Sequence, residues 1–166
     1  MRYFNLKNTT MKKVLLLLTV ITSLTTQAQW KLGYYVDEFG DKTEESYMRM
    51  RALGTFSNSA TQKSKCVYDF VDSGESMELH VREYGSSMAT DTKSTFETVK
   101  IKTPSGEVKL IKNVFFSKSG ILLFHKDTYA QIKSILMEEG RYVIVFNRSG
   151  KYSNSSYKIV IEYQSI

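Results

Sequence analysis

Apolar and polar residues alternate in short runs along most of the chain, and a period of two is typical of β-strands with one buried face. Turn-forming residues separate the runs: DSGES from Asp72 predicts a tight hairpin turn, and TPSGE from Thr103 predicts another. The pattern therefore indicates a β-rich domain built mainly from hairpins. The predicted alternating strands are residues 30–36, 47–53, 65–71, 77–84, 95–102, 107–112 and 157–163.

A different pattern follows in the C-terminal third of the chain. Residues 121–124 and 142–146 are apolar at successive positions, which is typical of strands covered on both faces. Between them, residues 128–139 carry apolar side chains at helical spacing, so we expect one amphipathic α-helix there. The side chains expected to face the core are Tyr129, Ile132, Ile135 and Leu136.

About nine short antiparallel strands with one helix predict a mainly β fold, either a β-sandwich or an open barrel. The alternative is an α+β sheet with the helix on one face. Because no repeat or linker divides the sequence, we expect residues 29–166 to form a single β-rich domain.

The first 28 residues have the pattern of a signal peptide. Lys12 and Lys13 form a basic segment, an apolar run begins at Val14, and Ala28 ends a plausible cleavage site. Met11 is the expected true start of translation. We therefore expect an exported protein, periplasmic or extracellular, with no transmembrane segment after the leader is removed.

Removal of this leader changes the charge of the protein. The whole chain has 23 Lys and Arg against 17 Asp and Glu, a net charge of +6. Residues 1–28 hold four of the basic residues and no acidic one, which leaves 19 against 17, or +2. So small a charge does not indicate nucleic-acid binding, and we expect none.

One hairpin nevertheless has a basic bias. We expect a solvated face there, with a weak contact to an anionic surface as the alternative. The lysines concerned are Lys100, Lys102, Lys109, Lys112 and Lys118.

Few residues offer catalytic or metal-binding chemistry. Cys66 is the only cysteine, and its place in an apolar strand favours a buried small side chain over a nucleophile. The two histidines, His80 and His125, have no zinc-binding spacing. We therefore predict no catalytic residue, no resident metal and no cofactor.

One acidic cluster has the carboxylate density that Ca²⁺ binds outside cells, but its spacing is not that of an EF-hand loop. We expect a solvated loop, with a Ca²⁺ site as the weaker alternative. The same carboxylates, together with His80, are the candidates for a hydrolase acting on glycan or peptide, which needs two carboxyl groups facing each other across a cleft. The cluster consists of Asp37, Glu38, Asp41, Glu44 and Glu45.

Two loop sequences, DEFGDKTEESYM from Asp37 and GTFSNSAT from Gly54, accompany Trp30 and the late strand–helix–strand unit. In these features the chain resembles small uncharacterised secreted β-rich proteins of Gram-negative gut bacteria. The order of the tryptophan strand, the D-x-x-x-D-K-T string and the central strands is also faintly similar to periplasmic accessory proteins associated with type VI secretion. The resemblance spans most of the mature chain and carries over no functional residue.

These observations favour an exported, non-enzymatic binding or accessory domain. It would contact a protein or a cell-envelope component through its loops or an exposed strand edge. The carboxylate-based hydrolase is the alternative. The sequence leaves open which residues bind, which partner is bound and what the oligomeric state is.

Overall fold

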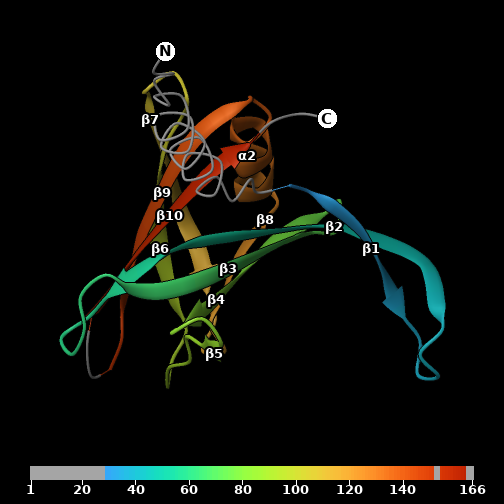
Figure 1. The fold of residues 1–166 in the computed structure, drawn as a ribbon, viewed down its shortest axis with the longest axis horizontal. Helices are drawn as coiled ribbons and strands as arrows, with labels where there is room; N and C mark the ends of the chain where they lie inside the picture. The colour runs from blue at the N-terminus through green and yellow to red at the C-terminus, as the bar shows by residue number, and fades with distance from the viewer. Residues whose placement is uncertain (1–28, 152–153, 164–166) are drawn as a thin grey trace, which may run out of the picture.

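A computed structural model, which describes residues 29–151 and 154–163, shows eight antiparallel strands in a closed barrel with two further strands and one α-helix (Figure 1). The strands are β1 Lys31–Val36, β2 Lys42–Ser57, β3 Ser64–Asp72, β4 Ser76–Glu83, β5 Ser87–Met88, β6 Thr95–Lys102, β7 Val108–Phe116, β8 Ile121–His125, β9 Gly140–Ser149 and β10 Asn154–Tyr163. Around the barrel the order is β2-β10-β9-β6-β7-β8-β4-β3, and β3 pairs with β2 to close it.

The mainly β class is thus confirmed, and two finer predictions are corrected. The barrel is closed rather than open, and no β-sandwich forms, because β2 pairs with β3 along one edge and with β10 along the other. The proposed leader, residues 1–28, lies outside the described residues.

Each predicted alternating run overlaps a strand and extends past its end by at most one residue, but β2 is much longer than predicted. Its 16 residues extend into both flanking segments that we expected to be loops, so that Lys42–Glu45 and Gly54–Ser57 are strand. The first of these extensions pairs only with β1, outside the barrel. Its side chains are mostly exposed on both faces, so the alternation that marks a half-buried strand is lost.

The helix α2 spans Asp127–Ile135, so the helix predicted near residues 128–139 is present but ends about one turn earlier. All four side chains expected to face the core lie in it or pack against it, and Ile132 is fully buried. The Tyr142 hydroxyl donates a hydrogen bond to the carbonyl oxygen of Ile135 (2.9 Å), one of the carbonyls that a helix end leaves free. In the described part of the chain, no helix is long and apolar enough to cross a bilayer.

Aromatic side chains fill the barrel. The rings of Phe146 and Tyr157, on the neighbouring strands β9 and β10, stack with their centroids 4.9 Å apart. Burial of this much aromatic surface makes the interior a packed core. The largest buried aromatic residues are Phe56, Tyr68, Phe70, Phe116, Phe124, Tyr142, Phe146 and Tyr157.

A buried cation holds the connections at one end of the barrel. Arg148 of β9 is 3% exposed, and its guanidinium group lies 4.3 Å from the ring centroid of Phe116. It donates hydrogen bonds to the carbonyl oxygens of Ala89, Lys93 and Ser117. These carbonyls belong to the β5–β6 and β7–β8 connections, so one side chain ties both connections to the barrel wall.

The successive apolar residues of β9 are not covered on both faces, and that expectation was wrong. Ile144 and its inward neighbours lie in the core, but Val143 and Val145 point outward and are only half-buried. The wall is a single sheet, so the described chain supplies no second layer over them.

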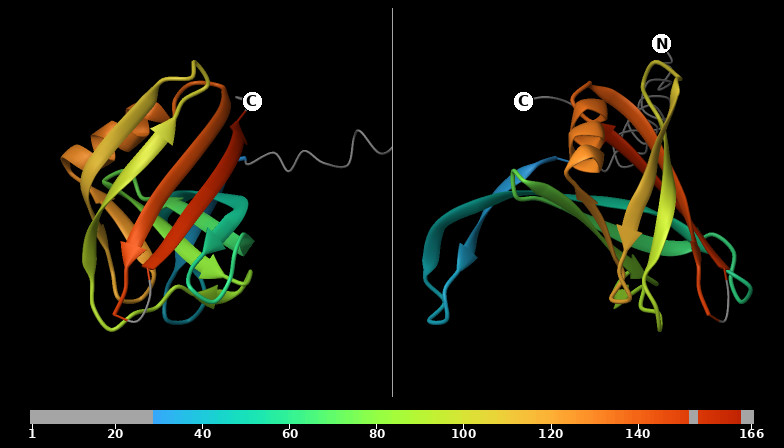
Figure 2. Two further views of the ribbon diagram at one scale, coloured as in Figure 1. Left: turned by 90° about the vertical axis from the view of Figure 1, so that its left-hand side faces the viewer. Right: turned by 180° about the vertical axis from the view of Figure 1, so that it is seen from behind.

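A hairpin formed by β1 and the first half of β2 projects away from the barrel (Figures 1 and 2). We call this hairpin, residues 31–49, the arm. Its strands pair from Lys31 opposite Arg49 to Val36 opposite Lys42. The barrel side of β2 begins only where β3 joins it, so the tip of the arm has no third strand beside it.

Candidate functional site

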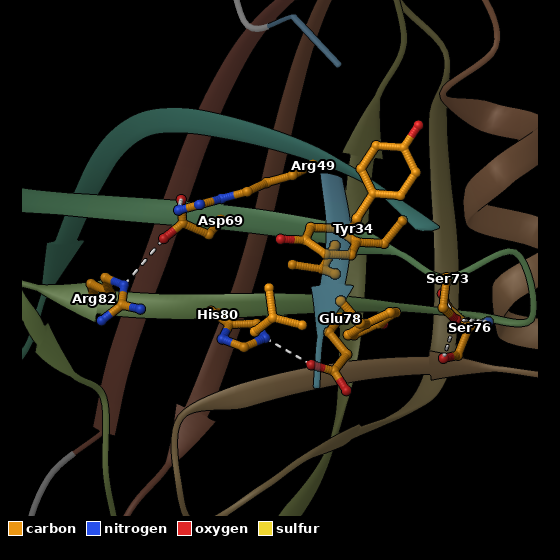
Figure 3. A pocket seen from close by; sticks show the side chains of 12 residues that line it. Tyr34, Arg49, Asp69, Ser73, Ser76, Glu78, His80 and Arg82 are labelled. Atoms are coloured by element: carbon orange, nitrogen blue, oxygen red, sulfur yellow. Dashed lines mark hydrogen bonds and ion pairs between the residues drawn. The ribbon is translucent and has the colours of Figure 1, made fainter. Parts of the chain in front are cut away.

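The arm and the outer face of the barrel enclose a hollow of about 610 Å³ (Figure 3). We call it the arm hollow. Its arm side is formed by Tyr34, Tyr35, Val36 and Tyr47. Its barrel side includes outward-facing side chains of β2, β3 and β4, namely Arg49, Asp69, Val71, Glu78, His80 and Arg82.

Alternation along β2 and β3 places the charged side chains on this outer face. Arg49 and Arg51 alternate with Met50 and Ala52, which lie in the core, so the two arginines point outward. Asp69 likewise lies between two core side chains of β3 and points outward. In the pairing of these strands Arg51 is directly opposite Asp69.

Three arginines surround this one carboxylate. Arg51 binds both oxygens of Asp69, with Nε 2.7 Å from Oδ1 and Nη2 3.2 Å from Oδ2. Arg49 Nη2 lies 3.2 Å from Oδ1, and Arg82 Nε lies 3.1 Å from Oδ2. The Asp69 side chain is 3% exposed as a result, although it lies on the outside of the barrel.

The arginines keep this buried carboxylate ionised. Burial alone would raise the pKa of Asp69, but hydrogen bonds from Arg51, Arg82 and Arg49 outweigh it and lower the pKa to about 2. The same contact raises the pKa of Arg51. Three guanidinium groups against one carboxylate leave the cluster with two net positive charges at neutral pH.

Most of the guanidinium donors remain available to a ligand. Each guanidinium group carries five N–H donors, and Asp69 takes one from Arg49, two from Arg51 and one from Arg82. The side chains of these arginines are 46%, 57% and 35% exposed, respectively. The cluster can therefore donate several further hydrogen bonds to an anion without giving up Asp69.

The positive charge continues past the edge of the hollow. Lys31 of β1 lies directly opposite Arg49, and a neighbouring hollow is lined by Gln29, Lys31, Arg49 and Arg51. A basic stripe thus runs from β1 across β2 to Arg82 on β4, with Asp69 at its centre.

One of the two histidines lines the same wall. His80 lies on the outer face of β4 together with Glu78 and Arg82, and it points into the arm hollow (Figure 3). Its Nε2 lies 2.7 Å from Glu78 Oε2. This pair places one carboxylate and one imidazole beside the arginines. His125 lies elsewhere, exposed at the end of β8.

The predicted acidic cluster is not part of the hollow. Asp37, Glu38, Asp41, Glu44 and Glu45 are all exposed along the tip of the arm, and none of them lines the arm hollow. Oδ1 of Asp37 accepts the backbone N–H groups of Phe39 and Asp41, so this carboxylate organises the turn itself. Within residues 29–151 and 154–163, no three His, Cys, Asp or Glu side chains gather as a metal site would require.

Cys66 is buried in the core, as its apolar strand predicted. Burial raises the pKa of the Cys66 thiol to about 11, so the thiolate that reacts as a nucleophile is scarce at neutral pH.

Sequence reasoning missed the arginine–aspartate cluster. A signal was present: Asp69 interrupts an otherwise apolar strand, and two arginines alternate with core residues in the strand YMRMRAL. A lone acid in such a strand needs a cationic partner if it is buried.

Comparison with known proteins found no match: no family model, no curated protein and no solved structure matches this chain.

Proposed function

We propose that this protein is an exported, non-enzymatic binding domain that contacts a protein or a cell-envelope component through the arm hollow. The observation that carries the proposal is the net positive cluster around Asp69 in a hollow walled by tyrosine rings. Guanidinium groups bind carboxylates and phosphates in bidentate geometry, and tyrosine offers apolar area with a polar tip. The feature recognised is therefore an acidic group carried beside an apolar or aromatic portion.

The hydrogen bonds between Asp69 and the three arginines favour a ligand-binding site over a patch of mobile surface charges. Arginine side chains that are free in solution lose rotamer freedom when they bind a ligand, and this loss weakens binding. Here each arginine is already held by one or two hydrogen bonds to Asp69. A ligand that binds their remaining donors meets a partly ordered site.

The hydrolase alternative has no observation in its favour. Its five candidate carboxylates lie on the exposed tip of the arm, away from the hollow. The carboxylates that do line the hollow are engaged, Asp69 by three arginines and Glu78 by His80.

The test is retention of a partner from an envelope extract by immobilised protein. The double substitution Arg49→Gln/Arg82→Gln removes two of the three cationic groups, and Arg51 keeps both of its hydrogen bonds to Asp69. We expect the component retained by the wild type to be lost. Arg141→Gln is the control, because this exposed arginine lies on β9 outside the hollow.

A small probe tests the chemistry directly. N-acetyl-tyrosine carries a carboxylate beside an aromatic ring, and N-acetyl-tyrosinamide is the same molecule without the charge. In an NMR titration, the acid should shift the resonances of residues lining the arm hollow, while the amide should not. Equal shifts by both probes, or retention of the same envelope component by Arg49→Gln/Arg82→Gln, would contradict the proposal.

A further inference from the structure

The outer face of β10, β9, β6 and β7 combines lysines with uncovered aliphatic side chains. Strand pairing places Lys158, Val145, Lys100 and Leu110 side by side in one row across these four strands. The next row across the same strands is Val160, Val143, Lys102 and Val108. We call these eight residues the lysine–valine face.

This face is open to solvent and electrostatically unbalanced. Val108 is 58% exposed and Leu110 is 50% exposed, while the three valines of β9 and β10 are half-buried. None of its three lysines forms an ion pair within the described residues. An exposed apolar surface with unpaired positive charge favours binding to a partner surface that is both apolar and acidic.

The arm has that complementary composition. Its tip carries five carboxylates against one lysine, and none of the five is in an ion pair with another described residue. The arm also carries exposed apolar side chains: Leu32 is 58% exposed near its base, and Phe39 is 82% exposed at its tip. Met48, directly opposite Leu32 in the β1–β2 pairing, is 37% exposed. None of these three apolar residues lines the arm hollow.

We propose that the arm of one molecule docks on the lysine–valine face of a second copy. The carboxylates at the tip pair with Lys100, Lys102 and Lys158, and the exposed apolar residues of the arm cover the aliphatic rows. Four strands at about 4.8 Å spacing give a face about 14 Å wide, and the six residues of β1 extend about 20 Å, so the arm can cross it.

The two surfaces lie on opposite sides of one molecule. The left view of Figure 2 looks onto β9 and β10 with the arm behind them, and Figure 1 shows the arm projecting from the other side. An arm therefore cannot reach the lysine–valine face of its own barrel. Because the two surfaces differ, the contact is head-to-tail, and each added molecule offers a new arm and a new face.

The test uses charge reversal of either surface in the purified protein. The face variant is Lys100→Glu/Lys102→Glu/Lys158→Glu. The arm variant is Glu38→Lys/Asp41→Lys/Glu44→Lys, which leaves Asp37 to organise the turn. By sedimentation velocity at low salt, we expect the wild type to show an average mass that rises to at least twice that of one chain as concentration increases. Each variant alone should remain a monomer.

Mixing the two variants is the decisive measurement, because the reversed arm then meets the reversed face. An equimolar mixture should recover the wild-type rise in mass. The matched control Lys63→Glu/Lys93→Glu/Lys118→Glu changes charge equally at exposed positions outside these four strands and should still associate. The proposal is overturned by a monomeric wild type, by a monomeric mixture, or by loss of association in the control. Binding of a probe in the arm hollow is independent of all three outcomes.

Discussion

Asp69 is a charged residue buried on the outside of the barrel, and its environment makes the stability of the fold depend on pH in acid. A buried carboxylate is costly unless cations and hydrogen bonds compensate it, and here three arginines do so. Its ionised form is favoured in the folded protein, where its pKa is about 2, over the unfolded chain, where the ordinary value is 3.8. Folding and ionisation of this group therefore support each other.

The first prediction is a loss of stability in acid that depends on Asp69. Because the folded pKa is the lower one, the stabilisation is complete above about pH 4 and disappears as the pH falls to about 2. Its size is about 2 kcal/mol in the free energy of unfolding, from the difference between the two pKa values. Urea unfolding followed by circular dichroism at several pH values measures it.

Asp69→Asn is the matched variant for this measurement, since the amide keeps the shape but cannot ionise. It should be less stable than the wild type at pH 7, and the difference between the two proteins should shrink as the pH approaches 2. A difference that is constant with pH would show that the arginines do not stabilise the ionised carboxylate.

The sequence predicts which face of its strand each residue of this cluster occupies, but not which residues of neighbouring strands meet. Alternation alone places Arg49 and Arg51 outward. The meeting of Arg51 with Asp69 follows from the register between β2 and β3, and Arg82 joins them only because β4 is the next strand. Register depends on how whole strands pack, so a single sequence places the residues on a face but does not bring them together.

At the scale of elements, the sequence pattern is most informative where burial is one-sided. The helix is predicted because Ile132 and its neighbours repeat at helical spacing. The predicted C-terminal end lies too far along the chain, because the residues after Ile135 are compatible with a further helical turn. The strand β2 is underpredicted where it leaves the barrel, since residues exposed on both faces show no period.

The second prediction tests how α2 is docked. Ile132→Ala removes a fully buried side chain and should lower the free energy of unfolding by about 2–5 kcal/mol through lost burial and a cavity. Gln131→Ala changes the exposed neighbour on the same helix and should stay within about 0.5 kcal/mol. Chemical denaturation of the two variants compares them, and similar losses would mean that the helix does not pack on the barrel as described.

At the scale of the whole molecule, closure depends on a short contact between β2 and β10. Only residues 54–57 of β2 pair with β10, and Gly54 lies at the end of that ladder. A Cβ atom on Gly54 would lie 2.1 Å from the carbonyl oxygen of Lys158. Two backbones therefore approach here more closely than any side chain allows.

The third prediction follows from this approach. Gly54→Ala should lower the free energy of unfolding by roughly 1–3 kcal/mol or more, because backbone in β10 must move to admit a methyl group. The control is Gly33→Ala on the arm, where a new Cβ would meet only the end of the Tyr47 side chain, which can turn away. Thermal unfolding should show the larger loss for Gly54→Ala, and equal losses would mean that the barrel is not closed at this point.

The order of the strands is the part of the fold that the sequence did not reveal. Hairpins such as β3–β4 follow from their turns, but the pairings of β4 with β8 and of β6 with β9 join segments far apart in the chain. Several arrangements of the same strands satisfy the same alternation. What selects this one is the fit of core side chains from all eight strands, which no local pattern encodes.

Closure by the last described strand has a consequence for how the chain acquires its structure. Phe56 and Tyr157, which pair where the barrel closes, are about one hundred residues apart, and contacts over such separations form slowly. Until they form, β2 and β10 each present an unpaired backbone edge, the kind of edge on which chains aggregate. A late-closing barrel thus passes through an interval during folding in which both edges are open to pairing with other chains, and the rate of closure sets how long that interval lasts.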